Sequence, residues 1–142
     1  MGKNSAKNIL VRSEGNIGFL ELNNPEKLNA ISLTMWSSLG KALEGFSKNS
    51  SIRCVMIKGA GNKAFSAGAD ISEFDDNRSD LKSIVIYENT SKNTMSLLQN
   101  FPKPTVASIN GYCIGGGLAL AISCDIRIAS KNSTFGIPAA KL

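Results

Sequence analysis

The 142-residue sequence contains no histidine. Histidine is the usual general base near neutral pH and the commonest zinc ligand, so these residues can form neither a Ser-His-Asp triad nor a histidine-based zinc site. Cysteine is scarce as well: Cys54, Cys113 and Cys124 are odd in number and lack CxxC spacing. This usage indicates reduced side chains and predicts a cytoplasmic location. Any catalysis therefore depends on other groups.

Aromatic residues make up only 6% of the chain, and the basic residues behind its net charge of +5 are scattered. No base-stacking platform can form, so we expect no nucleic-acid partner. The positive charge could favour a polyanionic small molecule, but scattered surface lysines that only confer solubility explain it better. The longest apolar stretch, residues 114–124, contains three glycines and is shorter than a membrane span of about 20 residues. We expect no membrane span.

The hydrophobic pattern of the first half predicts a hairpin, a helix and a buried strand. Residues 8–12 and 17–22 are β-rich and flank turn residues at 13–16, which is typical of two antiparallel strands. Ser32 can cap a helix that runs to residue 48, with apolar residues recurring at three- and four-residue steps. The apolar run 54–57 resembles a strand buried on both faces.

The second half continues the alternation of helices and strands. A long helix is predicted from Leu81 to the prolines that begin at Pro102. Residues 105–109 and 126–129 read as strands, residues 111–117 as a loop, and residues 118–123 as a helix. The order β-β-α-β-α-β-α-β predicts an α/β layer fold with parallel crossovers.

The segment 59–64 matches G-x-G-x-x-A directly after a predicted strand, so a dinucleotide site has to be considered. Such a site requires a helix that begins at the glycines and holds the pyrophosphate at its N-terminus. The residues that follow have no helical apolar period. We therefore predict a turn here.

Two other small-residue segments favour anion chemistry. Residues 67–70 leave backbone N–H groups open to a ligand, and Asp70 can cap a short helix that begins at Ile71. Residues 115–117 are glycines at the start of a predicted helix, where the first N–H groups lack intrahelical partners. Close helix–sheet packing explains the glycines equally well. If one N–H from each segment converged, they would form an oxyanion hole for a developing enolate.

Several motifs in order resemble the enoyl-CoA hydratase/isomerase, or crotonase, family. They lie at residues 24–30, 64–70, 102–105, 110–112, 115–117 and 124–129. The resemblance implies a ClpP/crotonase-like α/β spiral of repeated ββα units, an acyl-CoA ligand and assembly into trimers or dimers of trimers. It also implies that the oxyanion donors are the backbone N–H groups of Ala69 and Gly116. The implied substrate contacts are Lys27, Leu28, Ser66, Ala67, Gly68, Asp70 and Gly115. No metal or separate cofactor is implied, because coenzyme A is part of the substrate.

The chain departs from the family at its proton carriers. Hydratases of the family use two glutamates, and the matching positions hold Ala119 and Ala139. Alanine transfers no proton, so Glu73, Glu88 and Tyr112 become the candidate acids or bases. Two hypotheses stay open: an enolate-stabilising enzyme, nominally an enoyl-CoA hydratase/isomerase, and an inactive acyl-CoA-binding or assembly subunit.

The chain is also short, because family members are nearly twice as long. We expect residues 1–142 to form a single crotonase-type core domain that corresponds to the N-terminal part of the fold and lacks the C-terminal sheet and helical region. Such a fragment would expose apolar sheet surface, which favours self-association.

Overall fold

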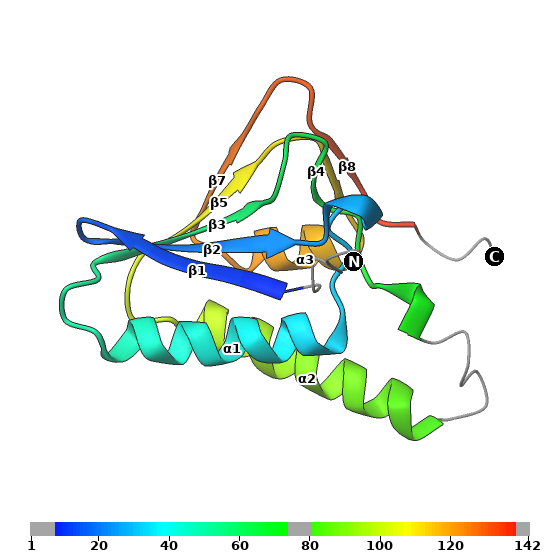
Figure 1. The fold of residues 1–142 in the computed structure, drawn as a ribbon, viewed down its shortest axis with the longest axis horizontal. Helices are drawn as coiled ribbons and strands as arrows, with labels where there is room; N and C mark the ends of the chain where they lie inside the picture. The colour runs from blue at the N-terminus through cyan, green and yellow to red at the C-terminus, as the bar shows by residue number, and fades with distance from the viewer. Residues whose placement is uncertain (1–7, 74–80, 139–142) are drawn as a thin grey trace, which may run out of the picture.

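The computed structural model describes residues 8–73 and 81–138 (Figure 1). Its main sheet has five strands in the order β1-β2-β3-β5-β7. The hairpin of β1 (Asn8–Glu14) and β2 (Ile17–Asn23) is antiparallel, and every other pair is parallel. The remaining strands are β3 (Cys54–Gly59), β5 (Thr105–Ile109) and β7 (Ile126–Ala129). The predicted hairpin and parallel crossovers are therefore confirmed.

A second sheet contains three strands of three residues each, in the order β4-β6-β8. They are β4 (Ala64–Ser66), β6 (Tyr112–Ile114) and β8 (Thr134–Gly136), and both pairs are parallel. The prediction that residues 111–117 form only a loop is wrong, because β6 lies inside that range. A strand this short is held by its neighbours and carries too few residues to show an alternating pattern.

The long helices α1 (Leu33–Lys48) and α2 (Leu81–Gln99) pack against each other on one side of the main sheet (Figure 1). Ser32 caps α1 as predicted, since its Oγ accepts a hydrogen bond from Met35 N at 3.1 Å. Two 3-10 helices, η1 (Pro25–Lys27) and η2 (Ile71–Glu73), lie in the connections. The short helix α3 (Gly116–Ile122) contacts β4 and β6.

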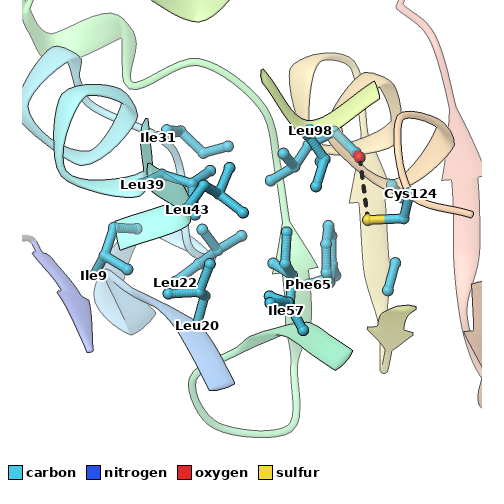
Figure 2. Packing of buried hydrophobic residues seen from close by; sticks show 14 of the residues in the cluster. Ile9, Leu20, Leu22, Ile31, Leu39, Leu43, Ile57, Phe65, Leu98 and Cys124 are labelled. Carbon is cyan, nitrogen blue, oxygen red and sulfur yellow. Dashed lines mark hydrogen bonds between the residues drawn. The ribbon is translucent and has the colours of Figure 1, made fainter. Parts of the chain in front are cut away.

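The core joins the two sheets to the helices. Figure 2 shows Ile57 and Phe65 between Leu22 and Cys124, and all four side chains are buried. Burying a side chain of this size contributes about 1.5–3 kcal/mol. The prediction that strand 54–57 is buried on both faces is wrong in part, because its burial alternates: Val55 and Ile57 are fully buried, whereas Cys54 and Met56 are half-buried.

A tight turn between β2 and α1 connects three separate segments. Leu28 and Asn29 both adopt left-handed backbone conformations, with φ of 52° and 57°. The Asn29 side chain accepts a hydrogen bond from Asn24 N at 3.0 Å and donates to the carbonyl oxygens of Ala60 at 2.9 Å and Ala64 at 2.8 Å. Because Asn29 is only 1% exposed, water cannot replace these partners.

We expect the substitution Asn29→Ala to lower the free energy of unfolding by about 3 kcal/mol, because it leaves buried backbone groups without partners. Urea denaturation measures the change. Asn100→Ala is the matched control: the side chain of Asn100 is exposed and donates to Ser96 O within its own helix region. The control should change stability by less than about 0.5 kcal/mol. Equal effects of the two substitutions would contradict this account of the turn.

Candidate active site

The small sheet brings the two small-residue segments together. Residues 67–70 follow β4, and the glycine triplet follows β6. These strands are parallel neighbours, so their carboxyl ends meet at the same edge. The contact is close: a methyl group built on Gly68 would lie 3.6 Å from Gly116 N. The two segments are more than forty residues apart in the sequence, and the pairing of β4 with β6 brings them together in space.

The backbone N–H of Ala69 points away from the neighbouring chain segment. Ala69 forms an isolated parallel bridge with Ile31, in which Ile31 N donates to Gly68 O at 2.7 Å and Asp70 N donates to Ile31 O at 3.1 Å. The C=O and N–H of a trans peptide group point in opposite directions. Because Gly68 O faces Ile31 N, the N–H of Ala69 in the same peptide group faces away from Ile31. Ala69 itself is exposed, and its N–H has no acceptor among the described residues.

The N–H of Gly116 is the second free donor. Helix α3 starts at this residue, and its first hydrogen bond runs from Ala119 N to Gly115 O at 3.0 Å. The N–H groups of the first helical turn have no intrahelical acceptor. Gly115 N donates instead to Gly136 O of β8 at 2.8 Å. Within residues 8–73 and 81–138, no acceptor lies within hydrogen-bond reach of Gly116 N.

The three glycines of the triplet differ in backbone conformation and in the space around them. Gly115 has φ of 55°, which favours glycine. A methyl group on Gly117 would lie 2.5 Å from Ser66 O, so this glycine allows α3 to pack against β4. A methyl group on Gly116 would meet no atom closer than Ala69 N, at 3.9 Å. Gly117 therefore serves packing, as one of the two interpretations predicted, whereas Gly116 has room beside it and its anion-binding role stays a prediction.

That open space is flanked by the Ala69 and Gly116 amides. It suits a small anionic oxygen, because an oxyanion hole requires donors about 2.7–3.1 Å from the developing charge. Backbone donors are fixed by the surrounding fold and need no reorganisation when charge develops. An arrangement of this kind requires no side-chain nucleophile.

Three of the side chains predicted to contact substrate stabilise the loop itself. Asp70, which is 2% exposed, accepts hydrogen bonds from Ser72 N at 3.2 Å and Ser72 Oγ at 2.6 Å, which confirms its predicted capping of the short helix at Ile71. Lys27 Nζ donates to Ser72 Oγ at 2.7 Å and lies 3.6 Å from Asp70 Oδ1. Ser66 Oγ accepts from Gly68 N at 3.1 Å.

The remaining predicted contacts lie beside this loop. Ala67 N donates to Leu28 O at 2.9 Å, which ties the turn after β2 to the segment after β4. A cleft of about 320 Å³ runs along the turn and is lined by Leu28, Asn29 and residues 60–64. Residues 60–63 form bends between β3 and β4 and no helix begins there, so the predicted turn is confirmed and the dinucleotide alternative is rejected. A larger cleft of about 500 Å³ lies between α1 and α2, apart from every predicted site residue.

The candidate acids and bases are dispersed. Glu73 ends η2, four residues after Ala69, whereas Glu88 is exposed on α2. Tyr112 is 49% exposed on β6 and lines a cleft of about 310 Å³ with Lys63 and Asn132. Ala119 lies on α3, and Ala139 is outside the described residues, as are the loop acids Asp75 and Asp76. In the described part of the chain, no three His, Cys, Asp or Glu side chains cluster to hold a metal ion.

Comparisons with a family model, with protein sequences and with solved structures all point to the same family. The family model described as enoyl-CoA hydratase/isomerase matches residues 12–142. A short-chain-enoyl-CoA hydratase of Clostridium acetobutylicum is 36% identical over 132 residues, which is 92% of this chain and 49% of the relative. A crystal structure of an enoyl-CoA hydratase/carnitine racemase from Magnetospirillum magneticum matches with a TM-score of 0.86 and 42% identity, covering 92% of this chain and 49% of that one. The chain thus spans about half the length of these relatives.

Two cysteines near the site are buried and have raised pKa values. Burial raises the pKa of Cys113, on β6, from 9.0 to about 11 and that of Cys124 to about 12. The Sγ of Cys124 donates to Leu120 O at 3.8 Å. Thiolates are the reactive form, so both side chains act as small apolar groups near neutral pH.

We expect a thiol reagent such as a disulfide dye at pH 8 to label the half-buried Cys54 in the native protein and to leave Cys113 and Cys124 unlabelled. All three should react in urea, because unfolding exposes the two buried thiols. The number and position of labelled sites are read by mass spectrometry after short exposure. Rapid native labelling of Cys113 would contradict the burial described for β6.

Proposed function

The chain belongs to the enoyl-CoA hydratase/isomerase family, and on this basis we propose that it binds an acyl-CoA thioester and stabilises its enolate between the N–H groups of Ala69 and Gly116. The single observation that carries the proposal is the close approach of these two donors at one edge of the small sheet. Loss of an α-proton moves negative charge onto the thioester oxygen. The donors bind this charge more strongly than the neutral carbonyl, which lowers the barrier.

The energetic scale is appropriate for catalysis, since one oxyanion donor is worth about 2.7–4 kcal/mol. Proton transfer needs a separate group, because Ala119 carries no carboxylate on α3. Glu73, Glu88 and Tyr112 are the candidates in this proposal. Glu73 is the nearest of them to Ala69 along the chain, and a general acid or base contributes about 10²–10⁴-fold.

The proposed contacts to the CoA moiety come from two segments that lie together. The first segment is Lys27 and Leu28, beside Asn29 in the turn after β2. The second is residues 66–68, at the end of β4. The hydrogen bond from Ala67 N to Leu28 O joins the two segments. The flanking Asp70 and Gly115 complete the proposed set. Since several of their side chains already hold the loop, substrate contact in this proposal runs mainly through backbone atoms.

A second candidate function is binding without turnover, in an acyl-CoA-binding or assembly subunit. The observation that favours it is Ala119, which cannot transfer a proton. The other residues of α3 are glycine or apolar, so none of them replaces the missing carboxylate. The two candidates share the oxyanion site and differ in proton transfer. They are separated by an assay that detects α-proton loss directly.

The proposal treats residues 1–142 as one core domain of a cytoplasmic protein that assembles as a trimer or hexamer. Exposed Ile126 and Ile128 on β7 supply apolar surface that favours self-association. None of the described helices has the length and apolar character to cross a membrane.

The experiment that tests the proposal measures binding and turnover separately. Calorimetric titration with an acyl-CoA measures affinity, exchange of the acyl α-proton in heavy water reports enolate formation, and crotonyl-CoA hydration tests the complete reaction. Binding with α-proton exchange supports the enzyme, whereas binding without exchange supports the subunit. No binding would overturn both.

We expect Gly116→Ala to retain the fold and to slow α-proton exchange by about 10²–10³-fold, because its methyl group enters the space 3.9 Å from Ala69 N. Isotope exchange followed by NMR measures the rate, and circular dichroism checks the fold. If the proposed enzyme is only a binding subunit, the same substitution should weaken acyl-CoA binding.

Two further substitutions control for added volume. Gly45→Ala, on the exposed side of α1 with no atom within 4 Å, should leave activity unchanged and raise stability by up to about 1 kcal/mol. Gly117→Ala should instead reduce stability, because its methyl group meets Ser66. Wild-type exchange and binding in Gly116→Ala would contradict the assigned oxyanion site.

A further inference from the structure

Resting on the proposed function, we propose that Tyr87 is a positioning residue for the reaction: its hydroxyl group holds the backbone of Ile31, which binds the peptide groups on both sides of Ala69. Tyr87 lies on α2, far along the chain from both residues. It touches neither of the two donors in the contacts described above, so its effect runs through the backbone of Ile31.

The Ile31 carbonyl oxygen accepts two hydrogen bonds. Asp70 N donates to it at 3.1 Å, and Tyr87 Oη donates at 2.7 Å. A carbonyl oxygen has two lone pairs, so these bonds use its full accepting capacity. Ile31 is completely buried, and water cannot substitute for either donor. The direction of this carbonyl is therefore fixed from two sides.

The position of Ala69 depends on both backbone groups of Ile31. Ile31 N donates to Gly68 O, in the peptide group that carries Ala69 N, and Ile31 O accepts from Asp70 N, in the next peptide group. If the carbonyl turned, Asp70 N would follow it, and Ala69, which lies between the two peptide groups, would shift. A shift of about 1 Å at a catalytic group is enough to slow a reaction by about 10²-fold.

The hydroxyl of Tyr87 is itself held in place. Trp36 Nε1, on α1, donates to Tyr87 Oη at 2.9 Å. Trp36 is buried, and the Tyr87 ring packs against the hydrophobic core. The indole thus fixes the hydroxyl as acceptor, which leaves its hydrogen for Ile31 O. A continuous path of hydrogen bonds runs from α1 through α2 to the loop that carries Ala69.

A matched pair of variants distinguishes two roles of Tyr87: positioning the backbone of Ile31, and simply holding α2 against α1. Tyr87→Phe keeps the ring and removes the hydroxyl. Thr94→Val also removes a buried bond between α2 and α1, from Thr94 Oγ1 to Trp36 O at 3.0 Å, but it does not reach Ile31. Replacing Tyr87 with 3-fluorotyrosine, a more acidic phenol, strengthens donation to Ile31 O without removing the ring.

Amide NMR of the protein without ligand is the first readout. We expect Tyr87→Phe to shift the Ala69 and Asp70 amide signals and to speed hydrogen exchange at Asp70 about tenfold. Thr94→Val should leave both signals unchanged, and 3-fluorotyrosine should shift them in the opposite direction to phenylalanine. If Tyr87→Phe fails to fold, the fluorinated variant alone decides the outcome.

The second readout compares the effect on the affinity for acyl-CoA with the effect on the rate of α-proton exchange. Tyr87→Phe should leave the dissociation constant for acyl-CoA within about twofold and slow α-proton exchange about tenfold, because only the transition state carries the full oxygen charge. Identical behaviour of Tyr87→Phe and Thr94→Val, in amide signals and in rate, would overturn the positioning role. Absence of acyl-CoA binding in the wild type would overturn the proposed function, while the amide signals would still decide whether Tyr87 directs Ala69.

Discussion

The close approach of backbone to backbone around the small sheet is the constraint on which the site depends. A methyl group on Gly59, Gly111 or Gly117 would collide with the backbone of residues 63–66. Only glycine at these positions lets β4 lie against the ends of β3 and β6 and the start of α3. Because β4 and β6 are parallel and adjacent, the segments that follow them arrive at one edge with their free N–H groups side by side. The positions of the two N–H groups therefore depend on close backbone packing, which leaves no room for a side chain at these three glycines.

In the proposed function, backbone amides take the place of side-chain catalysts, so a chain without histidine could still stabilise an enolate. Backbone N–H groups are present whichever side chain the residue carries. They need no shifted side-chain pKa in order to donate a hydrogen bond. Hydrogen bonds keep the surrounding segments in position: Ile31 binds Gly68 O, Asp70 N and Tyr87 Oη, and Asn29 donates to Ala60 O and Ala64 O. In the proposed function the backbone stabilises the transition state, and proton transfer is a separate task for side chains around the same two amides.

The sequence predicted the elements whose patterns repeat over several turns or alternations. Helix α1 with its Ser32 cap, helix α2, the hairpin and strands β5 and β7 all match closely. The three-residue strands were not predictable, because β4, β6 and β8 are defined by their neighbours rather than by their own periodicity. Ala69 and Gly116 were identified by motif, and the structure adds that they lie together. Ile31 and Tyr87 carried no signal: one acts through its backbone, and the other is linked to it over 56 positions of sequence.

The central claim is that the N–H groups of Ala69 and Gly116 bind one thioester oxygen. The most direct measurement is the infrared band of a ¹³C-labelled thioester carbonyl in acyl-CoA bound to the protein. Two hydrogen bonds polarise the carbonyl, so the account predicts that the band moves to lower frequency than in free acyl-CoA. A bound carbonyl that absorbs at the frequency of free acyl-CoA in water, or at a higher one, would contradict it.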